Sequence, residues 1–295
     1  MRGLLESVPN FSSGRDAGAV TAIRTAVEAH AAVLDVHSDA DHHRSVYTIV
    51  ADEADLAETL LVGIVRSAEL VDLRSHDGIH PRVGAADVVP IVPLRTGEMA
   101  LANEVALALG RRVGDEVGLP VFLYGVSGNG RRPAFFRRGG PAELQRRIDV
   151  GELQPAFGPS RLDPRAGAVL IGARPLLIAF NVELRTGDLA DAQAIAAAIR
   201  ESSGGMKGVQ ALGLLLPGSG RIQVSVNVID VEAAPLVGVV ERVREVAAAR
   251  SVAVGRSELV GLLPESAVAD PASLGLDALP DDRVLERVLA LEQSP

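Results

Sequence analysis

Apolar runs with the spacing of strands alternate along the chain with Ala-rich amphipathic stretches, which is the pattern of an α/β protein. The pattern predicts strands at Leu4–Pro9, Ala32–Asp35, Ser45–Ala51, Val88–Leu94, Val121–Tyr124, Leu176–Asn181, Gly208–Leu216, Ile222–Val228 and Ala253–Arg256. It predicts helices at Asp16–His30, Ala54–Leu70, Gly97–Gly118, Pro141–Asp149, Asp188–Glu201, Ala234–Arg250 and Asp281–Leu291. Asp188 directly precedes the apolar period of its helix, so we expect it to cap that helix.

The second half of the chain has the predicted order β-α-β-β-α-β followed by a C-terminal helix, which is the split βαβ order of ferredoxin-like sheets. A chain of 295 residues is long enough for two domains of about 100–200 residues. We therefore expect an α/β (α+β) fold with two subdomains, residues 1–179 and 180–295, each a mixed or antiparallel sheet covered by helices.

Regular periodicity fails between Gly125 and Gly172, where Gly, Pro and Arg are concentrated. Loops of that length inside a compact domain are usually functional or disordered. The stretch and its border carry aromatic and basic residues together, namely Phe135, Phe136, Phe157, Arg137, Arg138, Arg161, Arg165 and Arg174. Arginine holds carboxylates in bidentate geometry, so we expect a binding loop for an anionic ligand here.

Composition removes several classes of function. The chain has no cysteine, which excludes disulfides, Cys-ligated metals and thiolate nucleophiles and favours a reducing compartment. A net charge of −9 and 3% aromatic residues argue against nucleic-acid binding. No apolar run reaches the length of a membrane span and the first residues do not form a signal peptide. A cytoplasmic protein without membrane or nucleic-acid partners is expected.

All six histidines lie within the first 80 residues, at His30, His37, His42, His43, His76 and His80. The last two have helical i, i+4 spacing, but Gly78 between them and Pro81 after them favour an irregular loop over a helical metal-binding pair. His80 is the leading candidate for proton transfer. Pro81 restricts its backbone, Arg82 could bind an anion, and Asp87 is close enough in sequence to orient the ring.

A second cluster, His37, Asp39, Asp41, His42 and His43, contains ligand types that bind divalent metals. The alternative is a polar loop capped by its own Asp side chains. We favour the polar loop, because close spacing alone is not specific and no further acidic cluster completes a site. No metal ligand is therefore assigned.

Several segments together resemble the formiminotransferase family, which moves a formimino group from N-formimino-L-glutamate to tetrahydrofolate. The resemblance covers about residues 4 to 266. Its segments are Ser7–Asp16, Asp35–Asp39, Arg44–Tyr47, His76–Val88, Phe157–Ser160, Ile178–Asn181, Gln223–Asp230 and Ser257–Pro264. It implies two α/β subdomains, a homodimer, and His80 as the catalytic acid and base, with Ile79 where members usually carry glutamate.

The resemblance also implies a folate-binding stretch consisting of Gly158, Pro159, Ser160, Arg161, Leu162, Asp163, Pro164, Arg165, Ala166 and Gly167. His37, Asp39, Arg44 and Arg82 complete the predicted substrate-binding set. Animal members have aspartate at the position of His37 and asparagine at that of His43.

The expected function is therefore glutamate formimidoyl transfer in histidine degradation, with formiminoglutamate and tetrahydrofolate as co-substrates and no metal. N5 of tetrahydrofolate is already a nucleophile, so the protein needs to align the reactants and move a proton. Three alternatives stay open: formyl transfer from N-formylglutamate, a metal-dependent amidine hydrolase that uses residues 37–43, and a folate-binding protein without catalysis. Because the sequence ends at Pro295 without a cyclodeaminase domain, we expect a separate cyclodeaminase to consume the product.

Overall fold

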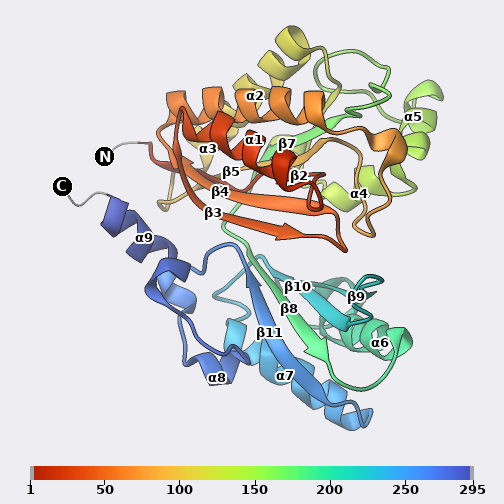
Figure 1. Cartoon of the computed structure of the whole chain (residues 1–295), viewed down its shortest axis with the longest axis vertical. Helices are drawn as coiled ribbons and strands as arrows, with labels where there is room; N and C mark the ends of the chain where they lie inside the picture. Colours follow the sequence, from red (N-terminus) through yellow and green to blue (C-terminus); the bar gives the residue numbers. More distant parts are fainter. Residues whose placement is uncertain (1–2, 293–295) are drawn as a thin grey trace. The chain divides into compact units, whose positions relative to one another are not determined.

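Residues 3–292 are described by the computed structural model, in which the chain divides into unit 1, Met1–Pro175, and unit 2, Leu176–Pro295. The division expected between residues 179 and 180 lies within the first strand of unit 2, which spans Ile178–Leu184. Each unit has its own sheet, one mixed and one antiparallel, and helices pack against both (Figure 1). The expected α/β fold with two helix-covered sheets is confirmed.

Unit 1 has a seven-stranded sheet in which β3 pairs with β4. After β4 come the two short strands β1 and β2, and then β5, β7 and β6. The two short strands β1 and β2 both lie between β4 and β5, separated by Val8 and Pro9. Pro9 has no N–H to give to a ladder, but its carbonyl accepts from Tyr47 N at 3.1 Å. The strand bounds are β1 Leu5–Ser7, β2 Asn10–Phe11, β3 Ala32–Asp39, β4 Arg44–Ala51, β5 Ala86–Pro93, β6 Val121–Leu123 and β7 Val169–Ala173.

The helices of unit 1 cover its sheet on both faces. Helices α1 Ala17–Glu28, α2 Glu53–Leu70 and α3 Met99–Arg112 pack on the face that presents Val89, Val121 and Ile171. Helices α4 Pro133–Arg137 and α5 Gly140–Asp149 pack with Phe122 and Leu170 from the other side of the pleat. The helix expected over Gly97–Gly118 is α3 with a π-helical continuation at Val113–Val117.

Helix α4 and all but the last residue of strand β7 lie within the stretch predicted to be irregular, so that part of the prediction is wrong. All five residues of β7 are buried, and the strand runs parallel to β5 and β6 between them. A strand buried on both faces has no polar alternation to reveal it. Helix α4 is only five residues long, too short to show a helical period.

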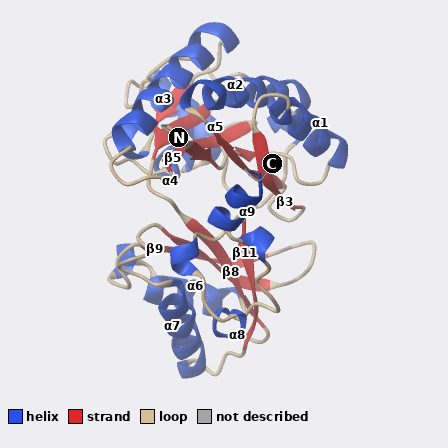
Figure 2. Cartoon of the chain, turned by 90° about the vertical axis from the view of Figure 1, so that its left-hand side faces the viewer, coloured by secondary structure: helices blue, strands red, loops and turns tan. Residues whose placement is uncertain are grey.

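Unit 2 has the order β8, α6, β9, β10, α7, β11, and its sheet order is β11-β8-β10-β9 with every pair antiparallel. This is the expected ferredoxin-like arrangement. Helices α6 and α7 cover one face of the sheet, where they pack on Phe180, Val182 and Val224 (Figure 2). The bounds are β8 Ile178–Leu184, α6 Leu189–Ile199, β9 Val209–Leu215, β10 Ile222–Val228, α7 Leu236–Ala249, β11 Val254–Val260, α8 Pro271–Leu274 and α9 Leu285–Glu292.

The expected cap of α6 is confirmed. Asp188 accepts a hydrogen bond from the backbone N–H of Asp191, and the Asp191 carboxylate accepts one from the backbone N–H of Asp188. This reciprocal pair satisfies two of the backbone donors that a helix start leaves without partners. In the part of the chain that the structure describes, no helix is both long enough and apolar enough to cross a membrane.

Candidate active site

The loop from His76 to Arg82 lies against the turn between β3 and β4 in unit 1. Gly78 makes this packing possible: a Cβ on Gly78 would stand 2.4 Å from the carbonyl oxygen of His42 and 2.6 Å from Cβ of His43. The backbone N–H of Ile79 donates to the carbonyl of Asp41 at 3.3 Å. The structure thus brings together the two histidine-rich segments, which are more than thirty residues apart in sequence, and the loop is irregular as expected.

His80 lies at the end of this packed region, and its ring contacts Arg44, the first residue of β4. The distance between Nη1 of Arg44 and Nε2 of His80 is 2.9 Å. Arginine has no acceptor, so Nε2 accepts this hydrogen bond and the imidazole carries its proton on Nδ1. Burial, and then the charges of Arg44 and Arg137, hold the pKa of His80 well below its ordinary value. The imidazole is therefore neutral, and its burial together with these charges opposes its protonation.

Asp87 does not orient His80, contrary to the sequence-based interpretation. One carboxylate oxygen of Asp87 accepts from the backbone N–H of Val83 at 2.7 Å, and the other accepts from Nη2 of Arg137 at 2.5 Å. Asp87 is 2% exposed, and Arg137 comes from the end of α4. A buried carboxylate with a cationic partner is satisfied by that partner, so Asp87 anchors Arg137 near the histidine.

Arg82 is buried and its guanidinium mainly supports the loop. Its donors reach the carbonyl oxygens of His42 at 2.8 Å, His43 at 3.2 Å and His80 at 2.8 Å. Burial lowers the pKa of Arg82 to about 10. The predicted role of Arg82 as an anion-binding group does not match these contacts, because both of its terminal nitrogens already donate to backbone carbonyls.

His43 and His76 form a ring contact beside Arg82, with centroids 4.1 Å apart and the planes tilted by 32°. His43 has φ 48°, and its Nδ1 accepts from the backbone N–H of Gly14 at 3.1 Å. Nε2 of His76 donates to the carbonyls of Ser12 and His43 at 3.1 and 3.2 Å. Burial, followed by the charge of Arg82, lowers the pKa of His76 to about 4. These rings hold the loop in place.

Half of the predicted polar loop at residues 37–44 is strand. His37 and Asp39 belong to β3, and only residues 40–43 form the turn. Asp39 caps the turn by accepting from the backbone N–H of His42 at 2.7 Å, and Nδ1 of His42 lies 3.0 Å from its other oxygen. Burial would raise the pKa of Asp39, but these hydrogen bonds from His42 outweigh it and keep the pKa below its ordinary value. Within residues 3–292 no three His, Asp or Glu side chains are grouped to hold a metal ion.

The predicted folate-binding stretch pairs with the segment Val83–Ala85, which directly follows the loop from His76 to Arg82. Gly167 pairs with Gly84, Ala85 N donates to the carbonyl of Ala166 at 2.8 Å, and Ala168 N donates to that of Val83 at 2.9 Å. Gly158 has φ 77°, and a Cβ there would stand 2.3 Å from the carbonyl oxygen of Leu119, so glycine is required. Except for Leu162, Ala166 and Gly167, this stretch is exposed, and the Asp163 carboxylate accepts from the backbone N–H groups of Arg165 and Ala166.

The arginines of residues 131–174 do not form one cluster. Arg137 joins the histidine site, whereas Arg165 lies 3.5 Å from the Asp72 carboxylate and Arg138 lies 3.9 Å from that of Glu152. Arg161 is exposed. Of the five arginines that the predicted binding loop and its border carry, Arg137 is the one whose charge acts on the His80 ring.

The site combines a neutral base with donors that have no partner. Nε of Arg44 and Nε of Arg137 are both buried without a hydrogen-bond acceptor. Asp87 is the carboxylate with which Arg137 forms an ion pair, and it neutralises one of the guanidinium charges beside His80. Uncompensated buried donors favour an anionic ligand. The Asp87–Arg137 pair and the contact between Arg44 and His80 were not predicted from the sequence, because no local motif indicates either of them.

The chain has two α/β units, and the first holds a neutral histidine among arginines. A site of this kind is suited to proton transfer on an anionic substrate. The formiminotransferase N-terminal subdomain model matches residues 4–174, and the formiminotransferase domain model matches residues 179–277. The chain belongs to the formiminotransferase family, and it is a transferase.

Curated relatives include both short and long proteins. The chain is 40% identical over 295 residues to a glutamate formimidoyltransferase of Thermoplasma acidophilum, with 96% of each chain covered. It is 34% identical over 279 residues to one of Streptococcus pyogenes, covering 92% of this chain and 93% of that protein. A formimidoyltransferase-cyclodeaminase of Sus scrofa is 38% identical over 284 residues, which are 92% of this chain and 52% of the relative.

Proposed function

We propose that this protein is a glutamate formimidoyltransferase, which moves the formimino group of N-formimino-L-glutamate to N5 of tetrahydrofolate and releases L-glutamate, a reaction of histidine degradation. The observation that carries the proposal is the neutral His80 ring, bound by Arg44 and set close to the Asp87–Arg137 pair, in a chain whose two units both match the family.

The chemistry needs one group that accepts and returns a proton. N5 of tetrahydrofolate forms a bond to the formimino carbon, and the proton of N5 passes to Nε2 of His80. The tetrahedral adduct then collapses as the bond between that carbon and the glutamate nitrogen breaks. His80 gives its proton to this leaving nitrogen, so the imidazole is neutral again at the end. Tetrahydrofolate is a co-substrate here, and no metal is needed.

Arg44 and Arg137 are proposed to bind a substrate carboxylate through their unpartnered donors. An anion between these guanidinium groups reduces the positive charge beside His80, which makes protonation of the ring easier during the reaction. The exposed part of Gly158–Gly167 is proposed to contact folate next to the loop that holds His80. His37 and Asp39, on β3, stay in the proposed substrate-binding set. Arg82 instead supports the loop from His76 to Arg82 by donating hydrogen bonds to backbone carbonyls such as that of His42.

The test is turnover by the purified full chain with tetrahydrofolate and either N-formimino- or N-formyl-L-glutamate, with and without a chelator. We expect chelator-resistant transfer from the formimino donor, measured as formation of 5-formimidoyltetrahydrofolate. Faster transfer from the formyl donor would replace the proposal by formyl transfer. Tetrahydrofolate-independent, chelator-sensitive release of glutamate would support the amidine hydrolase, and folate binding without turnover of either donor would leave a binding protein.

Two features implied by the family resemblance are also proposed. The protein forms a homodimer, which light scattering at micromolar concentration tests directly, and a monomer there would contradict it. The Sus scrofa relative is named as a fusion with a cyclodeaminase. We propose that a separate cyclodeaminase consumes the product of this chain, and a coupled assay with such an enzyme would measure it.

A further inference from the structure

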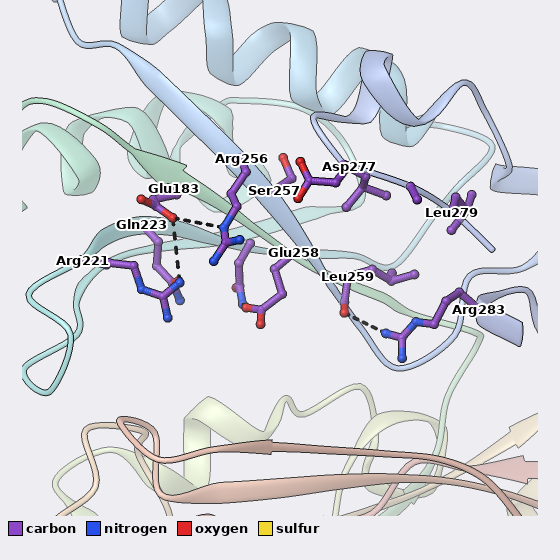
Figure 3. Close-up of a pocket in the computed structure, with 13 residues that line it drawn as sticks. Glu183, Arg221, Gln223, Arg256, Ser257, Glu258, Leu259, Asp277, Leu279 and Arg283 are labelled. Atoms are coloured by element: carbon purple, nitrogen blue, oxygen red, sulfur yellow. Dashed lines mark hydrogen bonds and ion pairs between the residues drawn. The ribbon is translucent and has the colours of Figure 1, made fainter.

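Buried polar atoms without a hydrogen-bond partner occur in both units. In unit 2 they border a cavity of about 330 Å³ (Figure 3). There Arg221 and Arg256 both face Glu183, at 3.8 and 3.9 Å from the same carboxylate oxygen, so these charged groups of the lining already face one another. In unit 1 the atoms without a partner include the hydroxyl of Tyr124, which the function proposed above does not use.

The two tyrosines of the chain are both buried, but only one of their hydroxyl groups has a partner. The hydroxyl of Tyr47 donates to the carbonyl of Val20 at 2.8 Å. The hydroxyl of Tyr124 is enclosed and forms no hydrogen bond with any of the residues 3–292. Burying a hydroxyl without a partner costs free energy that phenylalanine in the same place would not. The fold therefore gives no reason for this hydroxyl, and a ligand would.

Tyr124 and Arg174 directly follow two neighbouring parallel strands. Strand β6 ends at Leu123 and strand β7 ends at Ala173. The backbone N–H of Tyr124 donates to the carbonyl of Ile171 at 3.1 Å, which continues the pairing of the two strands. In α/β sheets ligands bind outside the carboxyl ends of parallel strands. Both side chains thus come from the edge of the unit 1 sheet where a ligand is expected.

Arg174 has no carboxylate partner. Its Nη1 donates to the carbonyl of Pro175 at 2.8 Å, and its partly buried guanidinium forms no ion pair within residues 3–292. Burial raises the pKa of Tyr124 to about 12, while the charges of Arg174 and Arg137 act to lower it, so both guanidinium groups lie near the hydroxyl. An arginine without an acidic partner beside an enclosed hydroxyl offers several donors to one carboxylate.

Tyr124 also borders the site around His80. Its ring belongs to one apolar cluster with Phe136, the residue before Arg137. The charge of Arg137 acts on the hydroxyl of Tyr124 and on the ring of His80. One guanidinium is therefore near both groups.

We propose that the hydroxyl of Tyr124 is a substrate-binding group that, together with the guanidinium of Arg174, receives a carboxylate of one of the two substrates. This inference rests on the function proposed above and adds a second anion subsite to the one formed by Arg44 and Arg137. Because Arg174 is partly exposed, the carboxylate meets it first and reaches the hydroxyl as the arginine side chain turns. Formiminoglutamate and the glutamate part of tetrahydrofolate both carry carboxylates, so the test treats each substrate separately.

Tyr124→Phe removes only the hydroxyl, and its effect is measured by steady-state kinetics in which N-formimino-L-glutamate and tetrahydrofolate are varied in turn. We expect the KM of one substrate to rise by about 10- to 100-fold, as for a lost hydrogen bond to a charged group, and kcat to change by less than about 3-fold. The substrate whose KM rises is the one that carries the carboxylate. Arg174→Gln should raise the same KM. The melting temperature of Tyr124→Phe should be no lower than that of the wild type, because the hydroxyl has no partner to lose.

Tyr47→Phe is the matched control, since it removes a buried hydroxyl that has a partner. It should lower the melting temperature and leave both KM values unchanged. Arg242→Gln, at an exposed arginine of α7 that pairs with Glu245, is the control for Arg174→Gln. The proposal is overturned if both KM values of Tyr124→Phe stay within about 2-fold of the wild type, or if Tyr124→Phe and Arg174→Gln affect different substrates.

A failure of the proposed function would be recognised separately. If the wild type turns over neither donor, calorimetric titration with N-formyl-L-glutamate and with tetrahydrofolate takes the place of kinetics. Binding of either compound that is weakened at least about 10-fold in Tyr124→Phe and unchanged in Tyr47→Phe supports the subsite. Equal binding by the wild type and Tyr124→Phe, or no binding of either compound at about millimolar concentration, overturns it.

Discussion

Arg44 donates a hydrogen bond to Nε2 of His80 across 2.9 Å, so the nitrogen that would take a proton from substrate is held by a cation. The two residues come from different segments, the start of β4 and the loop before β5. The contact fixes the ring orientation and its tautomer, and it opposes protonation. An anionic substrate that draws Arg44 away would free the nitrogen and lift this opposition at the same time.

Replacing His80 should slow proton transfer, and it removes the hydrogen bond from Arg44 and the contact with the His42 ring, whose centroid lies 6.1 Å away. For His80→Gln and His80→Ala we expect kcat to fall by about 10²–10⁴-fold, the range of general acid–base catalysis, with nearly unchanged folate affinity. Steady-state kinetics and a thermal melt measure the two effects. His30→Gln, at an exposed histidine, is the control. Near-wild-type turnover in the His80 variants would remove the assignment.

The pH profile should lack a limb near 6.5. The pKa of free His80 is well below its ordinary value, so the base form persists on acidification and kcat/KM should not fall there because of this group. Arg44→Gln removes one of the charges responsible. The pKa of His80 should then rise toward about 6.5, and an acidic limb should move upward into the measurable range.

The control for the pH profile is Arg24→Gln, an exposed arginine of α1 that pairs with Glu28. Its profile should match that of the wild type. NMR titration of the His80 ring in each protein reports the same pKa shift without substrate. An unshifted His80 resonance in Arg44→Gln would show that the two side chains are not coupled in solution.

The Asp87–Arg137 pair should matter for stability, because both side chains are mostly buried. Breaking a buried pair by removing one partner costs about 3–5 kcal/mol. We expect Asp87→Asn and Arg137→Met each to lower the free energy of unfolding, and the double variant to lose less than the sum of the two. Urea denaturation of the four proteins gives the coupling. Additive losses would mean that the ion pair contributes no interaction energy.

The free energy of unfolding should fall when the pH is lowered from 7 toward about 4, and His76 is one cause. The pKa of His76 is about 4 in the folded protein and 6.5 for a free histidine side chain. As the pH falls, the unfolded chain therefore takes up this proton at a higher pH than the folded protein does. Stability then rises with pH across this window, by at most about 1.4 kcal/mol per pH unit for one such group. His76→Gln should flatten the dependence measured by urea denaturation at several pH values, and an unchanged slope would contradict the neutral buried state.

Gly78→Ala should displace the loop from His76 to Arg82 from the turn between β3 and β4, because the new methyl group would stand 2.4 Å from the carbonyl oxygen of His42. We expect lower kcat together with lower stability. Gly238→Ala is the matched control, since a Cβ there meets nothing within 4 Å and the residue lies in helix α7. That variant should be slightly more stable, by about 0.5–1 kcal/mol, and fully active. Equal behaviour of the two variants would show that the loop tolerates the shift.

Elements with a strong local signal were predicted from the sequence alone. Amphipathic helices such as α2 and α7, the strands that alternate or flank turns, and the cap at Asp188 follow from neighbours a few residues apart. The order of elements in unit 2 was enough to predict the strand order of its sheet, because the connections allow few arrangements. His80 was selected by its local context and by the family resemblance.

Other features depended on the tertiary structure, because they join segments that are far apart in the chain. The partner of Asp87 is Arg137, fifty residues away, and the partner of His80 is Arg44, thirty-six residues away. Strand β7 is defined by its pairing with β5 on one side and with β6 on the other. The pKa of His80 is set by burial and by charges from β4 and α4, which no local pattern contains. The sequence by itself determined which groups could react, and packing decided which charges surround them, because electrostatic interactions depend on distance in space and on exposure to water.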